Sequence, residues 1–345
     1  MPVLRCLFVF VVFLASVLPA AARTITDAAG RTVEVPDKIE RVLAAGPPAS
    51  VLVYVLAPEK LAGWVREPKG EEKAFLLPSV RDLATFGQLT GKGGTANMEA
   101  VLAAKPDIII DVGTVNPTYA SLADKVQAQT GIPYILIDGA FAKSAETLRE
   151  TGAILGVSER AETLAAYAEA RLAALKKGLA GIPEDKRPAV YYGRGAEGLE
   201  TGLAGSINME ILEAAGARNV AAAAGKGGLT QVSLEQVLSW KPDVILAASP
   251  KFAASVKSDP LWAELDAVKA ARIHVTPSLP FGWIDSPPGI NRLIGIAWLE
   301  HTLYPEAFPG ALDQEVRDFF KLFYQVELDG TQLETLLGPG KAAAK

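Results

Sequence analysis

Residues 98–110 read MEAVLAAKPDIII and residues 234–246 read LEQVLSWKPDVIL, so one thirteen-residue phrase occurs twice in this chain of 345 residues. Seven of the thirteen positions are identical, and the copies begin 136 residues apart. Solenoid repeats have periods of about 20–50 residues, so this longer period indicates two similar lobes. Each copy predicts a short helix, a break at Lys-Pro-Asp and a buried strand. Clefts between domains are preferred ligand sites, so we expect the ligand between the lobes.

A Gly-Lys-Gly-Gly run precedes each copy, at residues 91–94 and 225–228. The runs lack the spacing and the following Ser or Thr of a phosphate-binding P-loop. Flexible loops are the simpler interpretation. The alternative is anion binding at the N-terminus of the helix that follows each run.

The first 22 residues are expected to be a secretory signal peptide with cleavage near Ala22. Arg5 is the only charge in this segment, an apolar run covers residues 7–18, and three alanines close it. The alternative is a retained N-terminal membrane anchor. Export predicts a periplasmic protein, and the absence of cysteine after Cys6 excludes disulfides and thiolate metal sites. Without Arg5, 33 basic residues stand against 39 acidic ones, with no basic cluster typical of nucleic-acid binding.

Alternating strands and helices predict an α/β fold with mostly parallel sheets. A hairpin is expected at residues 24–35, and the strands of the first lobe are expected at residues 41–45, 60–65, 108–112 and 134–137. Residues 189–192, 244–247 and 272–275 predict the strands of the second lobe, and residues 293–303 and 316–323 predict late helices. Apolar residues at helical spacing predict one long helix over residues 158–179, with Ser158 as its cap. We therefore expect an N-terminal lobe at 23–157, a connecting helix at 158–181, and a C-terminal lobe with a helical extension at 182–345. Ser50 is expected to cap a helix at residues 51–56.

Catalytic signals are few. The chain has two histidines: His274 falls in a strand pattern and His301 on an apolar helix. Neither zinc-binding His spacing nor a Gly-x-Ser-x-Gly motif is present. The sequence therefore predicts no catalytic residue, no metal site and no cofactor.

Aromatic and cationic residues at the predicted strand ends are the candidates for ligand binding, because ligands of open α/β sheets lie at the carboxyl ends of strands. Aromatic faces together with guanidinium groups suit a large, flat, partly anionic ligand. Glycines flank Arg194 and Trp283 in predicted loops, which favours these two. The predicted ligand-binding residues are Trp64, Arg66, Phe86, Tyr119, Phe141, Tyr192, Arg194 and Trp283.

The chain resembles the periplasmic binding proteins for ferric siderophores, haem and cobalamin that feed ABC importers. The resemblance rests on the hairpin phrase at residues 25–36, both Glu-x-Val-Leu-x-x-Lys-Pro-Asp copies, the connecting helix, and residues 285–288. It implies two α/β lobes joined by one rigid helix, with the ligand between them and no enzymatic activity. It also implies that one glutamate per lobe docks onto permease arginines, which places that role on Glu99 and Glu235.

The resemblance implies a monomer that binds an iron chelate or related metal complex and delivers it to an inner-membrane ABC permease. Leu229 stands where the cobalamin-binding member has a tryptophan, which argues against cobalamin. A molybdate or tungstate oxyanion remains an alternative ligand. An exported enzyme that uses the same cleft, and a receptor that signals without transport, are the alternative functions.

Overall fold

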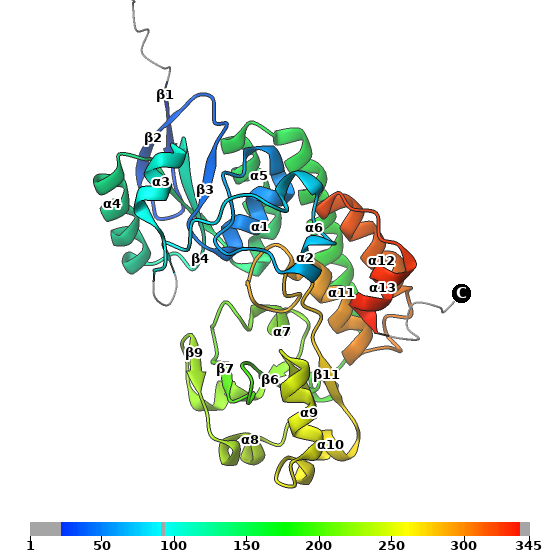
Figure 1. Cartoon of the computed structure of the whole chain (residues 1–345). Helices are drawn as coiled ribbons and strands as arrows, with labels where there is room; N and C mark the ends of the chain where they lie inside the picture. The colour runs from blue at the N-terminus through cyan, green and yellow to red at the C-terminus, as the bar shows by residue number, and fades with distance from the viewer. Residues whose placement is uncertain (1–21, 91–93, 339–345) are drawn as a thin grey trace, which may run out of the picture.

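The computed structural model describes residues 22–90 and 94–338 and shows two lobes joined along one side by helices (Figure 1). In the N-terminal lobe an antiparallel hairpin lies beside a parallel sheet of order β3-β4-β5. Its strands are β1 (Ala22–Thr26), β2 (Thr32–Pro36), β3 (Val42–Ala44), β4 (Ile108–Gly113) and β5 (Tyr134–Asp138). The predicted signal peptide lies almost entirely outside the described residues.

The C-terminal lobe holds a second parallel sheet, of order β11-β10-β6-β8, and a small antiparallel pair, β7-β9. Its strands are β6 (Ala189–Gly193), β7 (Glu200–Gly202), β8 (Arg218–Asn219), β9 (Leu229–Gln231), β10 (Val244–Ala247) and β11 (Ile273–Val275). The predicted α/β class with two mostly parallel sheets is confirmed.

The repeated phrase forms the same structure in both lobes. The first copy forms α3 (Met98–Ala104) and the second α8 (Leu234–Trp240), each followed by a central strand. Both helices have side-chain caps, as Asn97 accepts a bond from the amide of Ala100 and Ser233 one from Gln236. The aspartate of each copy then accepts a hydrogen bond from a backbone amide at the neighbouring strand. Asp107 accepts from the Arg41 amide at 2.8 Å, and Asp243 accepts from the Ala189 amide at 2.7 Å. The repeat therefore fixes a helix, a break and a strand junction together.

The remaining helices cover the sheets or connect them. They are α1 (Pro47–Leu56), α2 (Gly70–Lys73), α4 (Pro117–Thr130), α5 (Ser144–Leu155), α7 (Glu210–Ala214), α9 (Pro250–Ser258) and α10 (Asp266–Lys269). The cap predicted at Ser50 is wrong, because prolines begin α1 earlier and leave Ser50 inside it. The strand predicted at 60–65 is also wrong: a 3₁₀ turn at Pro58–Lys60 is followed by single bridges from Leu61 and Trp64.

The connecting helix α6 spans Ser158–Leu179, with the bounds that its apolar spacing predicts. Val157 occupies the N-cap position, so the cap predicted at Ser158 is wrong by one residue. Helix α6 packs along α5 in the N-terminal lobe, and Arg171 on it pairs with Glu300 and, at 3.0 Å, with Glu315. Within the described ranges, no helix is both long and apolar enough to cross a lipid bilayer.

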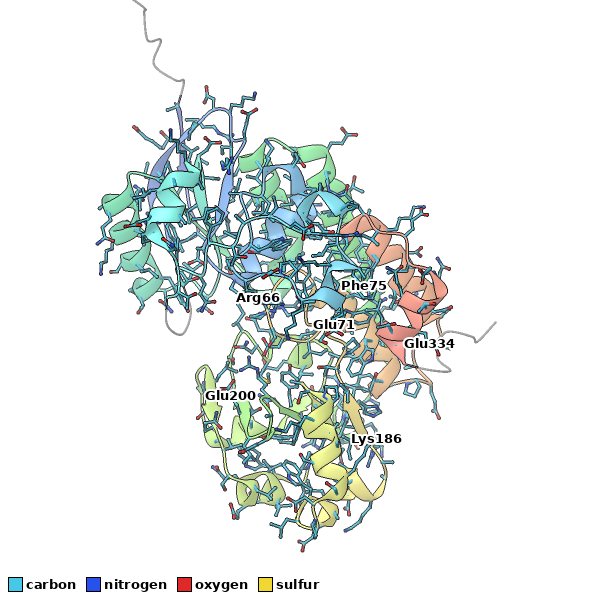
Figure 2. The ribbon with its side chains drawn as sticks, viewed as in Figure 1. Arg66, Glu71, Phe75, Lys186, Glu200 and Glu334 are labelled. Atoms are coloured by element: carbon cyan, nitrogen blue, oxygen red, sulfur yellow. The ribbon has the colours of Figure 1, made fainter. Side chains whose placement is uncertain are left out.

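The C-terminal helices return to the N-terminal lobe. They are α11 (Arg292–Leu303), α12 (Leu312–Phe319), the π-helical turn η7 (Phe320–Tyr324) and α13 (Gly330–Leu337). The Tyr54 hydroxyl on α1 donates to the Tyr324 carbonyl at 2.8 Å, and the Phe75 and Phe320 rings lie 6.0 Å apart. Figures 1 and 2 show these helices, in orange and red, beside α6 and Phe75. The aromatic side chains of this segment, which the sequence analysis grouped with the C-terminal lobe, join a hydrophobic core that contains residues of both lobes.

Candidate ligand-binding cleft

Two cavities lie between the lobes and share a wall. One has a volume of about 330 Å³ and the other about 370 Å³. Pro47, Pro48, Arg194 and Pro288 line both, so the cavities are two compartments of one cleft. We call the first the Trp64 cavity, with Val51, Trp64, Leu76 and Phe281 among its lining, and the second the Asp111 cavity, with Gln88, Thr90, Asp111, Tyr119 and Leu229 among its lining. In Figure 2, Arg66 and Glu200 mark the facing edges of the two lobes.

Helix α1 begins at the shared wall. Gly46 is its N-cap, and Pro47 and Pro48 are its first two residues. Prolines are suited to this position because their fixed φ matches the helix and their missing N–H groups would be unbonded there. The Ser50 hydroxyl is buried, lines the Trp64 cavity, and lacks a hydrogen-bond partner among the described residues. The positive end of the α1 dipole therefore lies at the shared wall of the cleft.

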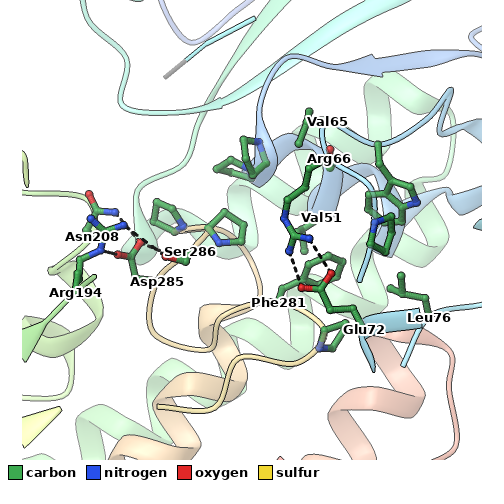
Figure 3. A pocket seen from close by; sticks show the side chains of 18 residues that line it. Val51, Val65, Arg66, Glu72, Leu76, Arg194, Asn208, Phe281, Asp285 and Ser286 are labelled. Atoms are coloured by element: carbon green, nitrogen blue, oxygen red, sulfur yellow. Dashed lines mark hydrogen bonds and ion pairs between the residues drawn. The ribbon is translucent and has the colours of Figure 1, made fainter. Parts of the chain in front are cut away.

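An aromatic wall and an ion pair form the N-terminal side of the Trp64 cavity (Figure 3). The Trp64 indole donates to the Val80 carbonyl at 2.7 Å, and its ring lies 6.0 Å from that of Phe281. Arg66 donates two bonds of 2.8 Å to the Glu72 carboxylate. Burial alone would raise the pKa of Glu72, but the bonds from Arg66 and from the Lys69 amide outweigh it and hold that pKa below its usual value. The pair therefore holds the Arg66 guanidinium at the cavity wall.

Arg194 separates the two compartments on the C-terminal side. It follows β6 and pairs with Glu200 and, at 2.6 Å from its Nε, with Asp285. Asp285 in turn accepts bonds of 2.6 Å from Asn208 and 2.7 Å from the Ser286 amide. Both arginines that line the cleft thus already have carboxylate partners. An anionic group on a ligand would have to share their N–H donors.

The Asp111 cavity is lined by the buried carboxyl group of Asp111. Asp111 lies on β4 with its carboxylate accepting bonds from the Tyr134 hydroxyl at 3.1 Å and from Thr90 Oγ1 at 3.2 Å. Burial raises the pKa of the Asp111 carboxyl in spite of these bonds. Sequence reasoning missed Asp111, although a lone carboxylate inside the apolar strand run of residues 108–112 is a readable signal.

Four of the eight predicted ligand residues line the cleft: Trp64, Arg66 and Arg194 at the Trp64 cavity, and Tyr119 with Arg194 at the Asp111 cavity. The other four pack in the hydrophobic core, namely Phe86, Phe141, Tyr192 and Trp283. The glycine beside Trp283 has a packing reason, because a Cβ on Gly282 would lie 1.8 Å from the Asp285 carbonyl oxygen. Glycine there permits a close backbone approach, and Trp283 itself is fully buried.

The two glutamates assigned to docking are exposed, each in the first turn of its helix. In Figure 1, α3 lies at the left of the upper lobe and α8 at the bottom of the lower lobe, both away from α11–α13. Of the Gly-rich runs, residues 91–93 lie outside the described residues, and residues 225–228 precede β9 instead of a helix. In the described part of the chain, no three His, Cys, Asp or Glu side chains gather as a metal site requires.

Comparison with known proteins identifies the family. Residues 62–279, more than half of the chain, match the model of the periplasmic binding protein family. The molybdate-binding protein MolA of Haemophilus influenzae is 30% identical over 88% of this chain and 92% of its own length. Its molybdate-bound structure has a TM-score of 0.74 at 26% identity, covering 89% of this chain and 99% of that one.

A solved ABC transporter solute-binding protein from Sulfurospirillum deleyianum is more similar in structure. It has a TM-score of 0.82 at 32% identity, covering 91% of this chain and 99% of its own. The fold, the cleft and the matched length all agree with these relatives. The chain therefore belongs to the periplasmic binding protein family, the solute-binding components of ABC importers.

Proposed function

We propose that this protein carries an iron chelate or a related metal complex in the interlobe cleft and delivers it to an ABC permease in the inner membrane. The observation that supports this ligand class is the pair of connected cavities, about 330 Å³ and 370 Å³. Drug-sized ligands occupy pockets of roughly 300–1,000 Å³ lined mainly by apolar side chains with a few polar groups. A chelate has an organic shell that would pack on Trp64, Leu76 and Phe281, while its acidic groups would meet the donors of Arg66 and Arg194.

A bare oxyanion such as molybdate is the second candidate. The likeness to MolA favours it, as does the positive end of the α1 dipole at the shared wall, although the prolines at the first two positions of α1 leave few N–H donors there. Against it, a small dianion would leave much of the apolar Trp64 cavity unfilled. The pairing of the cleft arginines with Glu72, Glu200 and Asp285 applies to either ligand class.

Native mass spectrometry of the protein purified from its own periplasm tests the ligand class directly. Titrations that follow tryptophan fluorescence should then compare haem, a ferric trihydroxamate, a ferric tricatecholate, a corrinoid and sodium molybdate. Trp64 borders the cleft, so its emission should change on binding. We expect one chelate per protein. Tight binding of molybdate or tungstate, with no response to any chelate, would replace this proposal with the second candidate.

The docking role of Glu99 and Glu235 is part of the same proposal. The repeat places one exposed carboxylate on each lobe, at equivalent positions of α3 and α8. An importer with two like permease subunits could offer two matching cations. Charged groups at an interface rim mainly set orientation and association rate, which suits a carrier that must dock and leave.

A further inference from the structure

Arg292, the first residue of α11, is 1% exposed and contacts both lobes. One terminal nitrogen donates to the Gly139 carbonyl in the N-terminal lobe at 2.9 Å. The other donates to the Ile207 carbonyl in the C-terminal lobe at 2.7 Å. A planar guanidinium can donate to two such acceptors at once, whereas the compact ammonium group of a lysine is less suited to acceptors on opposite sides.

Glu210 and Phe141 complete this contact between the lobes. The Glu210 carboxylate, on α7, lies 3.4 Å from the Arg292 nitrogen that donates to Ile207. It also accepts a hydrogen bond of 2.8 Å from the Phe141 amide of the N-terminal lobe. The Arg292 guanidinium also lies over the Phe141 ring, 5.1 Å from its centre. Two side chains, one cationic and one anionic, therefore each hold groups from both lobes.

The contact lies directly behind the ligand cleft. Ile207 lines the Asp111 cavity, and Arg292 Nε donates at 3.2 Å to Gly289, next to the shared wall residue Pro288. The space beside Arg292 is only about 10 Å³, at the limit for a single water. Arg292 is buried and the Glu210 side chain is 30% exposed, so solvent screens the pair only from the Glu210 side.

We propose that Arg292 and Glu210 form a clasp that fixes the angle between the lobes and so sets the width of both compartments of the cleft. Helix α6 is one connection between the lobes, and a single helix still permits rotation at its ends. The chain also returns to the N-terminal lobe through α11–α13, and the clasp adds a side-chain connection that lies closer to the cleft. Arg292 is thus a positioning residue, and its effect on affinity rests on the proposed function of the cleft.

Distances between the lobes test the clasp without any ligand. The sequence has one cysteine, Cys6, inside the predicted signal peptide, so cysteines added to the mature chain can be labelled selectively. Ala103→Cys and Ser239→Cys place spin labels at equivalent exposed positions of α3 and α8. Pulsed electron paramagnetic resonance should give a narrow distance distribution for the parent. Arg292→Met should shift and broaden it, and Arg292→Lys should give an intermediate width.

Arg160 supplies the matched control. It is partly buried, less so than Arg292, and donates to three carbonyls, those of Val55, Leu322 and Phe323. All three belong to the N-terminal lobe and the C-terminal helices packed on it, so Arg160→Met should lower stability without changing the interlobe distance. An unchanged distribution in Arg292→Met would overturn the clasp. If Arg292→Met does not fold, Arg292→Lys and Glu210→Ala are read in the same way.

Calorimetric titration with hemin and with sodium molybdate adds a second measurement. For either probe that the parent binds, Arg292→Met should weaken binding about tenfold, and Arg160→Met should leave it unchanged. Equal affinity of Arg292→Met and parent, beside a broadened distance distribution, would remove the clasp's role in setting cleft width. If the parent binds neither probe, the ligand proposal is in question, while the distance measurement still decides whether the clasp exists.

Discussion

Lys105 and Lys241, 136 residues apart, adopt the same left-handed backbone conformation, with φ of 47° and 48°. Each follows the last residue of a repeat helix and precedes the proline that starts the turn into a central strand. Residues other than glycine are strained in this backbone conformation, at a cost of roughly 1–3 kcal/mol. The strain recurs because both lobes need the same abrupt change of direction between helix and strand.

Replacing these lysines with glycine should therefore stabilise the protein. We expect Lys105→Gly and Lys241→Gly each to raise the free energy of unfolding by up to about 1 kcal/mol, since relief of strain is partly offset by backbone entropy. Urea denaturation measures the change. Lys125→Gly, at an exposed position inside α4, is the control and should lower stability by about 1 kcal/mol. Loss of stability in both repeat variants would contradict the strain argument.

The same repeat explains why much of the fold could be predicted. The pattern around Lys105 and Lys241 is local, so helix, break and strand follow from adjacent residues. The cleft is different, because its walls come from segments far apart in the sequence, such as Trp64 beside Phe281. Gly282 resembled a flexible ligand loop in sequence, yet only the folded chain shows the Asp285 carbonyl that requires it. Likewise, no local pattern indicates that Tyr324 would pack on Tyr54.

Arg194→Ala should weaken ligand binding by about 1–3 kcal/mol, the scale of hydrogen bonds to a charged group. It removes the donor between the two compartments and leaves Glu200 and Asp285 facing the cleft without their shared cation. Fluorescence titration with the probe that binds the parent measures the loss. Arg218→Ala, at a mostly exposed position of the same lobe, should bind like the parent. Parental affinity in Arg194→Ala would exclude Arg194 from the site.

Trp283→Ala should lower the free energy of unfolding and leave ligand affinity unchanged. Trp283 is fully buried, its indole donates to the Leu279 carbonyl at 3.1 Å, and its ring contacts Phe320. Removing a buried aromatic side chain of this size costs about 3–5 kcal/mol through lost burial and the remaining cavity. A lowered denaturation midpoint, with affinity retained in the folded fraction, is the expected result. A weakened affinity at unchanged stability would instead restore the ligand role that the sequence suggested.

The Arg66–Glu72 pair should make stability depend on pH in acid. The folded-state pKa of Glu72 lies below its usual value, so the pair contributes stability above the unfolded pKa, near 4.3, and loses it as pH falls through the folded value. The stability difference between the parent and Glu72→Gln should thus be largest above about pH 5 and shrink below about pH 4. Urea midpoints between about pH 3 and 6 measure it. A difference that stays constant across this range would show that the pair adds nothing.

Glu99→Ala combined with Glu235→Ala should impair transport while leaving ligand affinity unchanged. Both carboxylates, on α3 and α8, are exposed, and neither is among the residues that line the cleft. Each contributes only about 0.3–1 kcal/mol to its helix N-terminus, so the fold should survive the double change. Rim charges act mainly through association rate. Binding to the reconstituted permease should therefore be slower than for the parent, with the largest deficit at low salt, where charges are least screened.

The matched control for docking is Glu150→Ala with Glu264→Ala, which removes two exposed carboxylates, one from each lobe, outside the repeat. This variant should transport and dock like the parent, because it changes net charge equally without touching α3 or α8. Uptake in cells and association kinetics with the permease in lipid discs measure both variants. A deficit shared by both pairs would point to net charge, and normal uptake by the Glu99/Glu235 variant would leave those two residues as helix-end charges alone.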